Sequence, residues 1–255
     1  MRKRKLKWGL SLSLVITITF GITLGVLAAV NGVWFHKEGT SDAYIYPITP
    51  TNNPEQWRQY QSRDEMLSAL QIPDETLQSM STDGLIETCL NYPMFSDMFF
   101  FNSTLAGFNN VCSHFNGLQE LFSRQDVGLK ISTLFQNSTF ENITNTDTSY
   151  ALRYHYLCYI LASDSILNSM TKDERKILLD SCISKAQEIA ENHTDSYSIN
   201  STLFVAARIA AKDNPNFIQL MNQEPSIEIF VELGELNQVT PDIVEALIPI
   251  LIEGE

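Results

Sequence analysis

The chain has 255 residues, of which 44% are hydrophobic and 18% are charged, and this balance excludes a wholly disordered chain. Five of the 17 basic residues lie between Arg2 and Lys7, whereas all 30 acidic residues lie from Glu38 onward. Residues 31–255 therefore carry 12 basic and 30 acidic side chains, a net charge of −18, which disfavours binding to nucleic acid or to anionic lipid headgroups.

The N-terminus has the pattern of an export signal. The basic segment Arg2–Lys7 precedes 23 uncharged residues, Trp8–Val30. As a helix these would extend about 34 Å, enough to cross a hydrocarbon core of about 30 Å. Cleavage near Ala28 is the alternative, because Val26-Leu27-Ala28 suits a signal peptidase. We therefore predict that residues 1–30 are a signal peptide or a single-pass membrane anchor, with the rest of the chain extracytoplasmic.

Residues 31–61 are predicted to be an extracytoplasmic tether. This segment contains Gly32, Gly39 and three prolines, and it has few apolar runs. Within it, the residues from Tyr44 to Ile48 include four large apolar side chains. We expect this short stretch to dock in an extended conformation on the domain that follows.

Residues 62–137 show the pattern of short amphipathic helices and form the predicted N-terminal helical subdomain. Ser62-Arg63-Asp64-Glu65 fits a capping box, which marks the first helix. A helix ending before Pro93 is followed by an expected helix from Pro93 through Leu105. Asn116-Gly117 is expected to break the next helix, because both residues tolerate a left-handed backbone. No window alternates with period two for long enough to predict a strand.

Residues 148–255 form the predicted C-terminal helical subdomain, after a polar loop over residues 136–149. Expected helices cover residues 150–167, the segment after the Thr171–Glu174 capping box, residues 199–211, and a last segment from Pro241. The fold class is thus all-α: a multi-helical bundle or an irregular stack of helical hairpins, preceded by the N-terminal transmembrane or signal helix. The residue pattern has no clean fixed-period repeat.

The four cysteines leave their redox state open. None of them has CxxC spacing, so a zinc or redox motif is disfavoured. An even number in an exported chain permits two disulfides, with three connectivities. Buried free thiols are the alternative, since reduced cysteine behaves as a small apolar residue. The four are Cys89, Cys112, Cys158 and Cys182.

The chain contains no convincing catalytic or metal-binding motif, and we predict no cofactor. The four histidines are scattered and no HExxH occurs. His155 and Cys158 share a helical face, but a buried cysteine without an electropositive neighbour is inert, so a structural role is favoured. Glu87 and Asp97 could pair as in a glycosidase, although acids are abundant in this chain. The aromatic run Phe99–Phe101 is either a sugar platform or, as is more common for such runs, part of the core.

One part of the chain resembles a known group of proteins. The matching segments are YPITP at residues 46–50, Ile72-Pro73, Met80-Ser81-Thr82, Leu90-Asn91-Tyr92-Pro93, and FNGLQEL at residues 115–121. Together they resemble a poorly characterised family of exported proteins from Gram-positive bacteria, over roughly residues 44–136. The resemblance implies an exported helical domain and carries over no catalytic residue.

Two hypotheses follow for the function. The first is a non-enzymatic extracytoplasmic helical module that binds an unknown protein or peptide at the bacterial cell envelope, with no nucleic-acid partner. The second is a hydrolase of cell-wall or extracellular polymer, which requires convergent titratable groups. The missing motifs favour the first. Candidate binding residues are the polar members of the recognisable stretch, for which local capping or a buried hydrogen bond is the alternative role: Asn91, Tyr92, Asp97, Asn116 and Arg124.

Overall fold

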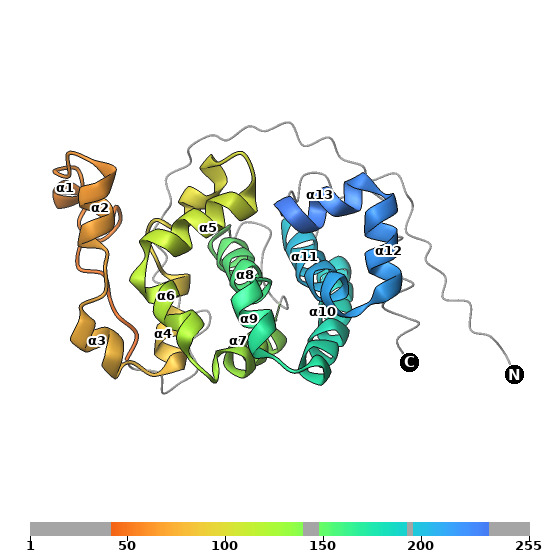
Figure 1. Cartoon of the computed structure of the whole chain (residues 1–255). Coiled ribbons are helices and arrows are strands. Elements are labelled where there is room, and N and C mark those ends of the chain that lie inside the picture. Colours follow the sequence, from red (N-terminus) through yellow and green to blue (C-terminus); the bar gives the residue numbers. More distant parts are fainter. Residues whose placement is uncertain (1–41, 140–147, 193–195, 235–255) are drawn as a thin grey trace, which may run out of the picture.

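Helices form every regular element of the described residues, which are 42–139, 148–192 and 196–234 of this computed structural model (Figure 1). The all-α prediction is confirmed for this part of the chain. The predicted segment 1–30 and the expected last helix from Pro241 lie outside the described residues. Within them, no helix is both long enough and apolar enough to cross a bilayer.

The bounds of the helices follow the local start signals closely. Ser62 accepts a hydrogen bond from Glu65 N, and Thr171 and Glu174 form the reciprocal bonds of a capping box, as predicted. The elements are α1 (Pro54–Trp57), α2 (Arg63–Ala69), α3 (Asp74–Ser79), α4 (Thr82–Leu90), the 3₁₀ helix η1 (Phe95–Phe100), α5 (Thr104–His114), α6 (Asn116–Ser123), α7 (Val127–Asn137), α8 (Thr148–Leu161), α9 (Asp164–Ser169), α10 (Lys172–Asn192), α11 (Ser196–Asp213), α12 (Pro215–Gln223) and α13 (Pro225–Leu233).

The extended segment before α1 docks on α4, as the sequence predicted. The Asp42 carboxylate accepts hydrogen bonds from the backbone N and the hydroxyl of Ser81, the N-cap of α4. Tyr44 N donates to Thr88 Oγ1 at 2.8 Å, and the Tyr46 side chain is buried. This part of the predicted tether therefore packs against α4.

Successive helices stack with a nearly constant spacing along the chain. α4, α7 and α10 begin at residues 82, 127 and 172, and each packs on the next. Hydrogen bonds between neighbouring layers join residues with similar separations, such as Ile72 with Asn116 and Tyr154 with Thr202. In Figure 1 the chain accordingly progresses from the orange N-terminal helices at one end to the blue C-terminal helices at the other. The repeat is one of helix spacing, with no matching repeat of residues.

Three predicted boundaries were wrong. The helix expected from Pro93 to Leu105 is divided into η1 and α5, because Ser103 caps α5 and accepts a bond from Ala106 N at 3.2 Å. The helix expected over 150–167 is divided where Ser163 caps α9. Asn116 begins α6 and the break lies at Phe115, so Gly117 is needed for space: an added Cβ would lie 2.3 Å from the Phe115 ring.

The buried side chains of both predicted subdomains belong to one hydrophobic cluster. The ring of Phe95 in η1 stacks on that of Tyr156 in α8, with centroids 4.1 Å apart, and α13 packs on α5. Most of the predicted boundary loop, residues 140–147, lies outside the described residues. The division into two subdomains stays a prediction, and the core extends across it.

Candidate binding site

A groove of about 600 Å³ lies between α2 and η1. Its walls combine apolar and polar side chains from the connection between α1 and α2, from α2, and from η1 with its flanking residues. The lining residues are Tyr60, Gln61, Ser62, Arg63, Met66, Met94, Asp97, Phe100 and Phe101.

The geometry of η1 explains why phenylalanine side chains reach the surface here. Phe95 and Met98 are three residues apart, lie on one side of the 3₁₀ helix, and are fully buried. The consecutive residues Phe99, Phe100 and Phe101 cannot all follow them inward, and they are 42%, 80% and 39% exposed. The interpretation of this run as core was therefore wrong. We refer to these three side chains as the phenylalanine patch.

A glycine in α5 holds η1 in this position. A Cβ added to Gly107 would lie 1.9 Å from the carbonyl oxygen of Met98, so only a residue without a side chain allows the two elements to touch at this point. The close approach buries Met98 against α5 and leaves the next residues of the chain on the outside.

An ion pair crosses the groove. Arg63 at the start of α2 donates to the Asp97 carboxylate from Nε at 3.1 Å and from Nη2 at 2.9 Å. The same Nη2 lies 3.4 Å from Asn110 Oδ1 on α5. The Arg63 side chain is 44% exposed, so this pair contributes little net stability and serves mainly to fix the two walls relative to each other.

Tyr92 lies close to this ion pair. Its ring stacks on Phe115 with centroids 3.9 Å apart, and its hydroxyl is buried with no hydrogen-bond partner among the described residues. Burial, and then the charge of Asp97, raise the pKa of Tyr92, whereas Arg63 opposes the shift. The phenol therefore remains protonated, and it can donate a hydrogen bond if water or a ligand reaches it.

Beneath Phe99 lies a buried histidine. The centroid of the His155 ring is 5.2 Å from that of Phe99, and Nδ1 is 2.6 Å from Ser201 Oγ. Burial lowers the pKa of His155 to about 3, so the ring is neutral. Its Nε2 has no hydrogen-bond partner within the described part of the chain, so no carboxylate there orients the ring for catalysis.

The His155–Cys158 pair has the structural role that the sequence favoured. The hydrogen-bond partner of His155 Nδ1 is Ser201 Oγ, and both His155 and Cys158 are buried away from solvent. Burial raises the pKa of the Cys158 thiol, which keeps it protonated and unreactive. All four cysteines of the chain lie in described residues, and all four are unpaired.

The sequence-predicted binding residues divide into two groups. Asn116 and Arg124 are structural: Asn116 bonds both the N and the O of Ile72, and Arg124 donates to the carbonyls of Leu77 and Met80 at the end of α3. The alternative to a binding role, a partly buried hydrogen bond within the protein, therefore applies to both.

The remaining three candidates lie toward α8 or the groove. Asn91 accepts a hydrogen bond from Arg153 Nη1 in α8. Asp97 lines the groove. Tyr92 lies near the groove, because the charges of Asp97 and Arg63 both act on the Tyr92 phenol. Sequence reasoning missed Arg63, Met66 and the outward orientation of Phe100. The three consecutive phenylalanines could have indicated that at least one ring faces outward, because a single helical face cannot bury three neighbouring residues.

The described lining of the groove does not contain the pair of carboxylates that a glycosidase uses. Among the described residues that line it, Asp97 is the only carboxylate, and it is paired with Arg63. Glu87, the proposed partner acid, interacts instead with the charge of Arg153. In the described ranges, no cluster of three His, Cys, Asp or Glu side chains could hold a metal ion.

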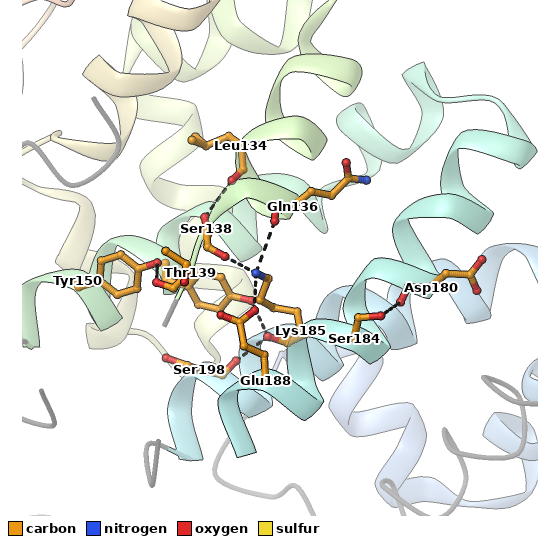
Figure 2. Close-up of polar contacts among 12 residues, drawn as sticks. Leu134, Gln136, Ser138, Thr139, Tyr150, Asp180, Ser184, Lys185, Glu188 and Ser198 are labelled. Atoms are coloured by element: carbon orange, nitrogen blue, oxygen red, sulfur yellow. Dashed lines mark hydrogen bonds and ion pairs between the residues drawn. The ribbon is translucent and has the colours of Figure 1, made fainter. Parts of the chain in front are cut away.

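A second hollow, of about 450 Å³, lies beside α10 and the end of α7, and includes Lys185 and Glu188. Figure 2 shows the Lys185 ammonium group between the carbonyls of Gln136 and Ser138 and the Glu188 carboxylate, to which it is bonded at 2.8 Å. The Lys185 side chain is only 8% exposed. Its bonds satisfy carbonyls at the C-terminal end of α7, so this site is a cap supplied by a neighbouring helix.

Comparisons of this chain with protein-family models, with curated proteins and with solved structures find no match.

Proposed function

We propose that this protein is a non-enzymatic helical module that binds a protein or peptide partner at the bacterial cell envelope, through the groove between α2 and η1. The observation that carries the proposal is the exposure of Phe100, which is 80% accessible beside an apolar depression formed with Met66 and Met94. Exposed aromatic side chains beside a preformed depression are typical anchors of protein interfaces.

The location and the architecture support the same proposal. The basic and then apolar N-terminal segment favours export, and so does the resemblance of residues 44–136 to exported proteins of Gram-positive bacteria. The interpretation as an irregular stack of helical hairpins fits the constant spacing of α4, α7 and α10. Such stacks present extended surfaces, which proteins use to bind other polypeptides.

A pull-down with matched variants tests the proposal. The full-length tagged protein, its Phe100→Ala variant and its Leu129→Ala variant are incubated with an envelope extract, with soluble wall polymer as competitor. Leu129 is 65% exposed on α7, away from the groove, and serves as the control. We expect a stoichiometric protein partner that Phe100→Ala loses and Leu129→Ala keeps. Equal retention by both variants, or polymer retention or turnover alone, would refute the proposal.

A further inference from the structure

The N-terminal part of the described chain has an unusual charge composition. Residues 42–129 contain no lysine, three arginines and eleven acidic residues, a net charge of −8. Two of the arginines are neutralised in ion pairs, Arg63 by Asp97 and Arg124 by Glu120, the latter at 2.7 Å. This part of the chain therefore carries an excess of negative charge, whereas the two charged residues that line the groove, Arg63 and Asp97, neutralise each other.

Exposed acids lie on the first three helices of the described chain, of which α2 lines the groove. Their carboxylates belong to α1, α2 and α3, and they outnumber Arg58 and Arg63, the cations on or beside these helices. The exposed acids are Glu55, Asp64, Glu65, Asp74 and Glu75. Of these acids, Asp64 and Glu65 are the nearest in sequence to Arg63, which lines the groove, because they follow it directly.

The two sides of α2 present different chemistry. Met66 and Arg63 line the groove, whereas Asp64, Glu65 and Ser68 line a shallow depression of about 620 Å³. Tyr60 belongs to both hollows and therefore stands between them. A ligand that crosses Tyr60 would meet an apolar surface on one side and two carboxylates on the other.

Tyr60 adds aromatic surface beside these carboxylates, and Trp57 packs against Tyr60. Their rings pack edge to face with centroids 5.6 Å apart. An ammonium or guanidinium group held by a carboxylate can also lie over an aromatic ring, which adds to its attraction. The combination of carboxylates and aromatic rings favours a cationic side chain over a neutral one.

We infer that the partner segment is a basic peptide with an apolar or aromatic anchor: the anchor enters the groove against Met66 and Phe100, and a neighbouring Lys or Arg lies over Tyr60 toward Asp64 and Glu65. This inference rests on the proposed function and names the chemistry of its partner. Charge complementarity is its basis, because the net charge of −8 over residues 42–129 repels acidic segments and attracts basic ones.

The test uses two labelled synthetic peptides and the full-length protein in neutral detergent. One peptide carries a phenylalanine followed by lysine and arginine residues, and its match has glutamates in place of these cations. Fluorescence anisotropy measures the affinity of each. We expect the basic peptide to bind at least about tenfold more tightly, and the difference to shrink as salt rises from about 0.1 M to about 1 M, which shortens the screening length from about 10 Å to about 3 Å.

Variants locate the binding. Asp64→Asn combined with Glu65→Gln should weaken the basic peptide by about three- to tenfold and should not weaken the acidic peptide, because it removes charges that repel that peptide. Asp180→Asn on α10 is the charge control and should have no effect. Phe100→Ala should weaken the basic peptide by about tenfold or more, because the anchor loses its aromatic contact. Circular dichroism of each variant checks that it is folded.

The outcomes separate this inference from the proposed function. Binding that depends on Phe100 but shows no preference between the two peptides would overturn the basic-partner inference and leave the proposed function intact. No binding of the basic peptide would overturn the inference as well. Displacement of the bound peptide by wall polymer, or self-association lost in Phe100→Ala, would assign the groove to a polymer or to a second copy of this chain and refute the inference.

Discussion

Replacing Lys185 by methionine removes one ammonium group and changes the side-chain volume little. In the native protein this ammonium bonds the carbonyls of Ser138 and Gln136 at the end of α7 and pairs with Glu188. Methionine cannot donate, so the carbonyls lose their partner at a position where the Lys185 side chain is 8% exposed. The variant therefore tests whether the cap contributes to the stability of the stack.

The magnitude follows from the number of bonds lost. A buried polar group left without its partner costs about 1–3 kcal/mol, and the bond to Gln136 O is long at 3.5 Å, so we expect a total loss of about 2–3 kcal/mol. For a protein of this size about 1 kcal/mol lowers the melting temperature by about 2–4 °C. Thermal unfolding followed by circular dichroism should therefore show a decrease of about 5–10 °C.

Two controls make the result interpretable. Lys176→Met changes an exposed lysine of the same helix and should alter stability by no more than about 0.5 kcal/mol. Glu188→Gln removes the charge of the pair but leaves the carbonyl bonds and an amide oxygen that can still accept from Lys185, and it should therefore cost less than Lys185→Met. A melting temperature of Lys185→Met equal to that of Lys176→Met would refute the capping role.

Three further predictions concern the core. Gly107→Ala should destabilise the protein by about 3 kcal/mol in urea unfolding, because its Cβ meets the Met98 carbonyl; wild-type stability would contradict the close approach of η1 and α5. A thiol titration of the denatured, unreduced protein should find four free thiols, and a smaller number would contradict the unpaired cysteines. In the native protein, alkylation at pH 8 should stay slow even at half-buried Cys112, because burial raises the pKa of Cys112 to about 12. His155 is protonated below about pH 6.5 in the unfolded chain, but burial lowers its pKa to about 3 in the folded protein. Between these pH values the unfolded state therefore binds more protons than the folded state. The free energy of unfolding should fall as the pH falls through this range, by up to about 1.4 kcal/mol per pH unit. His155→Gln should remove this part of the slope, and an unchanged slope would mean that His155 is not buried as a neutral ring.

Local structure was largely predictable from the residues. The capping boxes at Ser62 and Thr171 begin helices where expected, and the docking of the segment around Tyr46 follows from its apolar side chains. Boundaries were missed where a single serine ended one helix and capped another, as at Ser103 and Ser163. A serine within an apolar helical pattern is compatible with continuation, and only the packing of the neighbouring helices selects the break.

The candidate site was less predictable than the helices. Asp97 was named from the sequence, but its partner Arg63 lies 34 residues earlier and shares no local pattern with it. Asn116 and Arg124 were named as well, and the structure assigns them to hydrogen bonds with backbone groups 44 to 47 residues away. Polar residues at helix ends have the same sequence signature whether they cap a distant helix or face a ligand.

The sequence alone determined that this chain is helical, where many of its helices begin, and that its surface beyond the N-terminal segment is acidic, because these properties depend on residue type and on neighbours within one or two turns. The tertiary structure decided which side chains meet. The 45-residue spacing of α4, α7 and α10, the contact of Gly107 with η1 and the outward position of Phe100 all depend on how separate helices pack. Packing is decided by shape complementarity over the whole core, which no local pattern encodes.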